Sequence, residues 1–480
     1  MRSPKAMSPD HETNTVKPEI DFLQTSVVEL AGQVRAGEVR ASTLVEHALG
    51  RIEERNPEIN AFVAIDAEAA LAAATEIDRQ VAAGKDPGSL AGIPIGVKDL
   101  EPAAGFVTTF GSALHADDPP AEIDSLLVTR LKTAGAIVIG KTNTPEFGHT
   151  ATTQNLVFGA TANPLNLDHT PGGSSGGSAA AIASGMVPLA TGSDGGGSIR
   201  IPSALCGLTG LKCQQGRIPY RQDGSSPAML LATGGPMART AADTAWALDA
   251  VRGPHWADPF SLPPDDRSWY EATLRAQLPA RVVWSPTMGF AEVDPEIALA
   301  CQAAVDALAA AGTEVIVDDT VFSELPMPGF WIHWLTYMRA RLEEYVDTPD
   351  LAKITPHLQD IVAEAAQVTG VESVRALTRM FARNHDVGSV LERHDAQFLL
   401  TPTIAQMPPT LEEIERDRGP ADWVQMTFAL NMTRHPAGSV PVTTSGVLPV
   451  GLQVIGRHFD EPGVLASMAF IEQLQDLSPA

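Results

Sequence analysis

The chain has 480 residues, of which 44% are hydrophobic, so it can bury a substantial core and is not expected to be disordered. Its 58 acidic residues outnumber its 33 basic residues and give a formal net charge of −25. A surface with this charge repels nucleic-acid phosphates and anionic lipid headgroups, so we expect neither nucleic acid nor a membrane as a partner.

Cysteine usage and apolar patterning indicate the compartment. Cys206, Cys213 and Cys301 are too few for a disulfide framework and lack the CxxC spacing of a zinc site. Residues 1–20 hold no apolar run that could act as a signal peptide, and no stretch reaches the about 20 apolar residues of a transmembrane helix. The sequence therefore predicts a cytoplasmic protein without a metal or another cofactor.

The N-terminal elements are predicted from helix-start signals. Residues 1–22 are polar and charged and are expected to form a flexible tail before one domain at 23–480. Ser26 and Thr43 are each followed three residues later by Glu, the spacing of a capping box, so a helix is predicted to begin at each. The Ala-rich segment 66–84 predicts a third helix.

The next elements alternate between strand and helix. The apolar run 92–97 is bounded by glycine and predicts a strand that ends at Lys98. Residues 125–133 have helical spacing, 136–139 form a compact apolar strand, and the Ala-rich segment 179–184 predicts a buried helix. Predicted strands and helices therefore lie on both sides of Lys98 along the sequence.

The C-terminal half contains a β–α–β unit. Residues 280–284 and 313–317 are predicted strands, and the Ala-rich run 298–311 between them is a predicted helix. Proline and charged residues gather at 253–268 and 402–420, which we expect to be surface loops. The alternation along most of the chain predicts a single α/β domain built on a central sheet.

One motif match is rejected on physical grounds. Residues 135–142 fit the phosphate-loop pattern G-x4-G-K-[ST]. That motif needs a Gly-rich loop after a strand, whereas the four variable positions here are the strand residues 136–139. Lys141 is therefore expected to be a strand-end residue without a nucleotide-binding role.

A second pattern stays open as an alternative. Residues 172–176 match the G-x-S-x-G nucleophile elbow, which would make Ser174 the nucleophile of an α/β-hydrolase-like esterase. An elbow needs a strand that leads into the serine, whereas 166–171 consists of turn-forming residues. Four downstream histidines could complete such a triad, namely His385, His394, His435 and His458.

The third pattern combines Lys98 with two Gly/Ser-rich runs, 172–178 and 194–200. A serine hydroxyl needs a base to become a good nucleophile, and lysine can serve if its pKa falls well below about 10.4. Three glycines before Ser198 leave backbone N–H groups free for an oxyanion, each contributing on the order of 3 kcal/mol. A phosphate-binding nest is the alternative, but no phosphate-loop lysine or acidic metal ligand accompanies it.

These residues resemble the amidase signature family. The resemblance extends over about 26–240 and 430–475, whereas 245–425 resembles the family only loosely and is expected to be its variable substrate region. Ser198 follows Ser174 by 24 residues, as in that family. The family resemblance implies a single large domain with a central mixed, twisted sheet of about eleven strands covered by helices.

The resemblance also implies residue roles. Ser198 would be the nucleophile, Lys98 the general base and Ser174, after a cis peptide bond, the proton relay between them. The remaining implied roles are an oxyanion hole from the backbone amides of Gly195, Gly196, Gly197 and Ser198, a hydrogen bond from Ser175 to Lys98, and loop bracing by Asp194 and Arg200.

The implied reaction is hydrolysis of an amide, anilide or carbamate that carries an apolar or aryl group. The expected partners are this small-molecule substrate and water, and the protein is expected to be a monomer or a homodimer. A glutaminase subunit of the tRNA-dependent amidotransferase is an alternative within the family, although 345–385 lacks its pattern. The segment 330–338, which begins at Phe330 and holds Trp331 and Trp334, predicts either an aromatic substrate wall or an ordinary buried helix. Three further positions match the family's pocket, Gly148, His149 and Thr150, and the glycine replaces a larger side chain and would widen the pocket.

Overall fold

The computed structural model describes residues 20–219, 230–416, 425–442 and 448–475. A five-stranded sheet with the order β1-β3-β2-β6-β8 forms one part of the fold. β3 and β6 run parallel to β2, while β1 and β8 are antiparallel to their neighbours. The strands are β1 (Phe62–Ile65), β2 (Pro94–Lys98), β3 (Ile137–Thr142), β6 (Leu189–Asp194) and β8 (Thr233–Met237).

A six-stranded sheet with the order β10-β9-β11-β13-β12-β7 forms the other part. An isolated bridge between Thr209 and Ala238 links the neighbouring ends of β7 and β8 and so joins the two sheets. Together the two sheets hold eleven strands in the described residues, in agreement with the mixed sheet of about eleven strands that the family resemblance implied. The strands are β7 (Gly210–Lys212), β9 (Arg281–Trp284), β10 (Glu314–Val317), β11 (Phe398–Pro402), β12 (Ala437–Val442) and β13 (Val450–Ile455); β4 (Gln154–Asn155) and β5 (Gly159–Ala160) form a separate hairpin.

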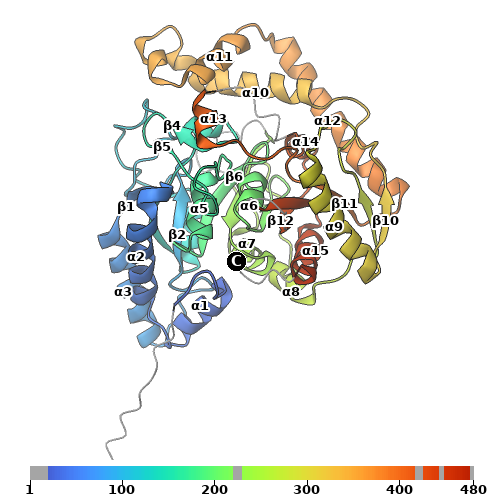
Figure 1. The fold of residues 1–480 in the computed structure, drawn as a ribbon. Helices are drawn as coiled ribbons and strands as arrows, with labels where there is room; N and C mark the ends of the chain where they lie inside the picture. Colours follow the sequence, from blue (N-terminus) through green and yellow to red (C-terminus); the bar gives the residue numbers. More distant parts are fainter. Residues whose placement is uncertain (1–19, 220–229, 417–424, 443–447, 476–480) are drawn as a thin grey trace, which may run out of the picture.

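Helices cover the sheets, and Figure 1 shows three of them, α10, α11 and α12, along the top of the molecule. The helices α1 to α3 lie at the lower left of the same view, and α5 and α6 lie near its centre. The helices are α1 (Val27–Arg35), α2 (Ala41–Ile59), α3 (Ala67–Ala82), α4 (Leu126–Thr133), α5 (Gly176–Ala183), α6 (Arg200–Leu205), α7 (Ala241–Val251), α8 (Trp269–Arg275), α9 (Pro295–Ala311), α10 (Met327–Leu342), α11 (Pro356–Ala365), α12 (Gly370–Arg393), α13 (Leu411–Arg416), α14 (Phe428–Thr433) and α15 (Glu461–Leu474).

The two predicted helix starts near the N-terminus have different outcomes. Ser26 caps α1 as predicted, and its hydroxyl accepts a hydrogen bond from the backbone N–H of Glu29 at 3.1 Å. Thr43 was expected to start a helix but lies inside α2, which begins at Ala41. The carboxylate of Asp78 in α3 accepts from the backbone N–H of Ala41 at 2.6 Å, so a tertiary contact caps α2 in place of the local residue.

The remaining predicted strands and helices match observed elements within a few residues, with one error in a loop. Residues 411–416 were expected to be loop but form α13. Thr410 and Glu413 make the reciprocal hydrogen bonds of a capping box, at 3.2 Å and 2.8 Å, so the helix start was visible in the sequence. The rejected phosphate-loop match lies on β3, which confirms that it spans a strand.

Three further expectations concern the N-terminal tail, the cysteines and membrane-spanning helices. Residues 1–19 of the expected tail lie outside the described residues, whereas Phe22 at its end is buried and packs edge-on against His47 with ring centres 4.8 Å apart. The three cysteines are buried free thiols. No helix in the described ranges combines the length and apolar composition that crossing a membrane requires.

Candidate active site

Lys98 occupies the C-terminal end of β2, between β3 and β6, and is fully buried. Its Nζ lies 2.8 Å from the hydroxyl of Ser174, 2.9 Å from that of Ser175 and 3.0 Å from that of Ser193. Burial lowers the pKa of Lys98 to about 7, although the charges of Asp194 and Glu101 act in the opposite direction. The amine is therefore surrounded by neutral hydroxyls, and its burial favours the neutral form far more than in an exposed lysine.

Ser174 lies in the glycine-rich loop that leads into α5 and is almost fully buried. The peptide bond between Gly173 and Ser174 is cis, as the family resemblance implied. A Cβ atom at Gly173 would lie 2.9 Å from the carbonyl oxygen of Thr152, and one at Gly177 would lie 2.4 Å from the backbone nitrogen of Asn143. The glycines therefore allow the loop and α5 to approach neighbouring backbone closely, and this approach places Ser174 beside Lys98.

Asp194 organises the loop that carries Ser198; we call residues 194–198 the oxyanion loop. Burial alone would raise the pKa of Asp194, but Arg200 holds it well below its ordinary value through an ion pair at 2.8 Å. The carboxylate also accepts hydrogen bonds from the backbone N–H groups of Gly197 at 2.8 Å and Ile199 at 3.2 Å. A permanently ionised side chain thus fixes the loop, the arrangement expected of Asp194 and Arg200.

The amide of Gly197 does not belong to the expected oxyanion hole, because it already donates to Asp194. The backbone N–H groups of Gly195, Gly196 and Ser198 donate to no group in the part of the chain that the structure describes. Gly197 has a φ of +134°, which favours glycine and lets its peptide unit turn toward the carboxylate. The four amides inferred from the glycine run are thereby reduced to three that remain available for an oxyanion.

Ser198 is half-exposed, whereas Lys98 and Ser174 are buried. The carbonyl oxygen of Ser198 accepts from the backbone N–H of Ser175 at 3.2 Å, so the two serine loops are joined. Among the described residues the Ser198 hydroxyl makes no hydrogen bond. The structure thus joins Lys98 to Ser174 through a hydrogen bond, whereas the Ser198 hydroxyl is left without one among the described residues.

Three residues from the C-terminal part of the chain hold the oxyanion loop in place. The hydroxyl of Thr427 donates to the carbonyl oxygen of Gly196 at 2.6 Å. The Arg200 guanidinium donates to Asn431 at 2.7 Å and to Gln453 at 2.7 Å. Thr427 and Asn431 were not expected in the site, because more than two hundred residues separate them from the loop and no local pattern links them. Ser193 was also not expected, although it directly precedes Asp194.

Of the three positions matched to the family's pocket, only Gly148 contacts a catalytic candidate. Its φ is +68°, and a Cβ atom there would lie 3.1 Å from the hydroxyl of Ser174 and 2.7 Å from Leu100. Its positive φ and the close approach of the Ser174 hydroxyl both favour glycine at this position. His149 bonds the carbonyl of Glu146 at 2.6 Å, and Thr150 donates to the carbonyl of Thr152 at 3.0 Å.

The two tryptophans expected in a substrate wall point to different neighbours. Trp334 in α10 covers the oxyanion loop, since a Cβ atom at Gly195 would lie 3.5 Å from its ring. Phe330, one turn earlier in the same expected aromatic segment, stacks on Trp334 with ring centres 5.8 Å apart. Trp331 instead donates from Nε1 to Glu364 in α11 at 2.9 Å. The segment is therefore a helix, and one of its faces covers the oxyanion loop.

The alternative with Ser174 as the nucleophile lacks a histidine. Ser174 accepts from Lys98, and the four candidate histidines have other partners. His394 bonds Asp318 at 2.7 Å and His385 bonds Ser389 at 3.1 Å. His435 and His458 stack on each other with ring centres 4.1 Å apart.

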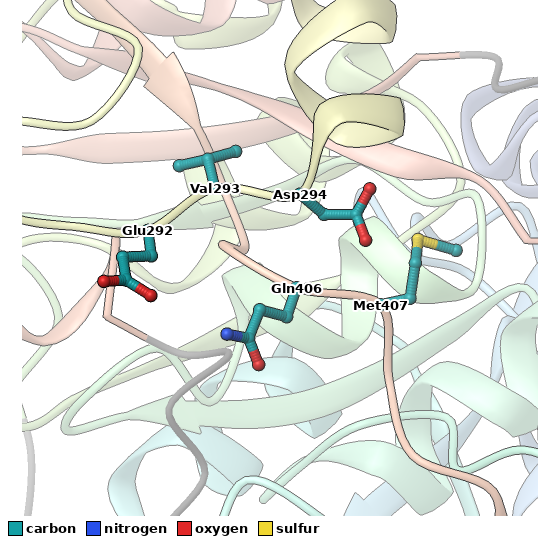
Figure 2. Close-up of a pocket in the computed structure, with 5 residues that line it drawn as sticks. All are labelled: Glu292, Val293, Asp294, Gln406 and Met407. Carbon is teal, nitrogen blue, oxygen red and sulfur yellow. The ribbon is translucent and has the colours of Figure 1, made fainter.

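A separate hollow of about 380 Å³ lies between the start of α9 and the segment after β11 (Figure 2). Its lining residues are Glu292, Val293, Asp294, Gln406 and Met407. The carboxylate of Asp294 caps α9 by accepting from the backbone N–H of Glu296 at 2.8 Å, so a structural role accounts for it. None of the lining residues belongs to the Lys98 and serine cluster, and we assign this hollow no catalytic role.

Comparisons with known proteins reveal related sequences and a shared fold. A protein-family model described as Amidase matches residues 43–465. The chain is 36% identical over 470 residues to an acylamidase of Rhodococcus erythropolis, covering 95% of this chain and 97% of the relative. It is 33% identical to a glutamyl-tRNA(Gln) amidotransferase component of Chromohalobacter salexigens, covering 94% and 96%. The crystal structure of a bacterial aryl acylamidase superposes with a TM-score of 0.87 at 27% identity, covering 95% and 96%.

Proposed function

Because this chain belongs to the amidase signature family and is an amidohydrolase, we propose that it hydrolyses amides, anilides or carbamates of apolar or aryl groups through an acyl-enzyme on Ser198. The observation that carries this proposal is the buried Lys98 amine, which has three hydroxyl partners and a pKa lowered to about 7. A lysine in this state can accept a proton near neutral pH.

The proton path follows from the order of the three groups. Ser198 Oγ attacks the carbonyl carbon while its proton passes to Ser174 and the Ser174 proton passes to Lys98. The tetrahedral intermediate collapses with breakage of the C–N bond, and the proton held by Lys98 returns through Ser174 to the departing nitrogen. Water then attacks the acyl-enzyme along the same path, which releases the acid and restores the Ser198 hydroxyl.

The environment of the oxyanion loop supports the same reaction. Free amides at Gly195, Gly196 and Ser198 can stabilise the negative charge that develops on the carbonyl oxygen. The aromatic side chains of Phe330 and Trp334, from the predicted substrate region 245–425, cover this loop and favour an apolar or aryl group beside it. The name of one structural neighbour, a bacterial aryl acylamidase, agrees with this preference.

The amidotransferase relative supports a second candidate, a glutaminase subunit, because its sequence aligns over 94% of this chain. Both candidates use the same serine and lysine residues, so the substrate distinguishes them. In the glutaminase reaction the acyl group would be polar and zwitterionic, which the aromatic cover of the oxyanion loop does not favour.

A panel of four substrates tests the proposal: a benzanilide, an aryl carbamate, an aliphatic amide and glutamine. Each is incubated with wild type, Ser198→Ala and the control Ser203→Ala, which removes a buried hydroxyl in α6 that makes no hydrogen bond. We expect anilide or carbamate turnover in wild type and the control and its loss in Ser198→Ala. Turnover of glutamine alone would favour the glutaminase candidate, and activity that survives Ser198→Ala would rule out Ser198 as the nucleophile.

A further inference from the structure

One face of α10 changes character along its length. Phe330 and Trp334, which cover the oxyanion loop, are followed on the same face by Tyr337 and Arg341, at helical spacings of three and four residues. The Trp334 and Tyr337 rings have centres 6.0 Å apart, and Arg341 donates from Nη1 to the Tyr337 hydroxyl at 3.2 Å. The apolar part of this face therefore ends at a guanidinium group.

Arg341 has no ionic partner within the described residues. Its guanidinium carbon lies 4.6 Å from the ring centre of Phe110 and 5.0 Å from that of Phe147. Aromatic faces hold a guanidinium in place but leave most of its N–H donors unused. In contrast, Arg339 on the same helix pairs with Glu343 at 2.5 Å.

The two rings beneath Arg341 are held by a strained backbone. Phe110 and Phe147 have φ values of +55° and +50°, a conformation that non-glycine residues rarely adopt. The backbone N–H of Phe147 donates to the carbonyl of Phe110 at 2.7 Å, and that of Phe110 donates to the carbonyl of Asp99 at 3.1 Å. The rings are thereby tied to the segment that directly follows Lys98.

The same rings mark one side of the reacting bond. Phe147 directly precedes Gly148, where a Cβ atom would lie 3.1 Å from the Ser174 hydroxyl. In the proposed reaction Ser174 delivers the proton to the departing nitrogen, whereas the oxyanion loop holds the carbonyl. We therefore assign Arg341 and its aromatic support to the leaving-group side of the proposed substrate, and Phe330 and Trp334 to its carbonyl side.

We infer that Arg341 binds a carboxylate carried by the leaving amine, so that the preferred substrates are N-acyl derivatives of amino acids or carboxylated arylamines. This inference rests on the proposed function. A guanidinium without an ionic partner pairs strongly with a carboxylate, and aromatic support fixes its orientation. Arg341 follows Trp334 by seven positions, which is roughly 10 Å along the helix. This distance suits a substrate with an aromatic spacer between the scissile nitrogen and the anionic group.

Two matched substrates test the inference: N-benzoyl-4-aminophenylacetate and N-benzoyl-4-isobutylaniline, which have nearly the same shape and differ in charge. We expect wild type to prefer the anionic substrate in kcat/KM. The Arg341→Met variant should lower the ratio of the two kcat/KM values by on the order of tenfold or more, and Arg341→Lys should lower it less. The ratio does not depend on how much of a variant is correctly folded.

Arg339→Met is the matched control, because it removes a guanidinium from the same helix and should leave the ratio at its wild-type value. A third substrate carries the carboxymethyl group on the benzoyl ring, and the Arg341 variants should not change its kcat/KM relative to benzanilide. An unchanged ratio in Arg341→Met, or a larger effect with this third substrate, would overturn the inference. Failure of wild type to cleave any of the substrates would instead contradict the proposed function.

Discussion

The ends of β2 and β3 hold two buried lysines that differ in their partners. Lys98 and Lys141 lie on adjacent parallel strands, and both are fully buried. Lys98 meets three serine hydroxyls, whereas Lys141 forms an ion pair with Asp99 at 3.0 Å and donates to the carbonyl of Glu101 at 2.8 Å. Two lysines with the same burial are thus placed in a neutral and an anionic environment.

This difference shows that burial alone does not make a lysine a base. Burial lowers the pKa of both side chains, but at Lys141 the ion pair with Asp99 acts against this effect and favours the ammonium form. Lys98 has no carboxylate among its hydrogen-bond partners, and its pKa falls to about 7. We therefore expect Lys98 to act in catalysis and Lys141 to act in stability, and substitutions can separate the two roles.

The largest effect is expected for Lys98→Met, which removes the proposed base. General-base catalysis contributes typically 10²–10⁴-fold, so kcat/KM for an anilide should fall by about 10³-fold. The melting temperature should change little, because the substitution leaves no unpaired charge in the interior. Lys132→Met, which removes a half-exposed lysine paired with Asp124, serves as the control for activity. Near-wild-type turnover by Lys98→Met at every pH would refute the assignment.

Lys141→Met should act mainly on stability. The substitution leaves the Asp99 carboxylate buried without its ionic partner, which should lower the free energy of unfolding by about 3–5 kcal/mol in denaturant titrations. The double variant Asp99→Asn/Lys141→Met removes both charges and should recover part of that loss. Wild-type stability in the single variant would mean that the two lysine environments do not differ as we describe.

Thr427→Val should have a smaller effect, on the chemical step. The substitution removes the hydrogen bond that holds the Gly196 carbonyl, and a lost hydrogen bond of about 1–1.5 kcal/mol corresponds to roughly tenfold in rate. We expect kcat to fall while KM changes little, and a boronic acid transition-state analogue to bind correspondingly less tightly. Thr427→Ser keeps the hydroxyl and should restore activity, so an equal loss in both variants would show that the hydrogen bond is not the cause.

The catalytic candidates were visible in the sequence because each belongs to a local pattern. An apolar strand ends at Lys98, and glycine-rich runs carry Ser174 and Ser198. The glycines in these runs let the backbone segments approach each other closely, and the positions of the glycines can be read from the sequence itself. The order of strands and helices was likewise predictable from hydrophobic periodicity, since each element depends mainly on its own residues.

Features that depend on distant residues were not predictable. Asp78 in α3 moves the start of α2 from Thr43 to Ala41, 37 positions away. The fixing of Gly196 by Thr427 joins residues 231 positions apart. In each case a tertiary hydrogen bond decided the outcome, and a single sequence holds no local signal for such a contact.

The measurement that tests the central claim most directly is the pH dependence of kcat/KM for an anilide in wild type, with acylation confirmed as rate-limiting by single-turnover kinetics. Raising the pH removes a proton from Lys98, whose pKa is lowered to about 7, and converts it to the active base. We expect log kcat/KM to rise with a slope near one below about pH 7 and to level off above it. A profile that is flat between about pH 6 and 9 would contradict the role of Lys98 as the base.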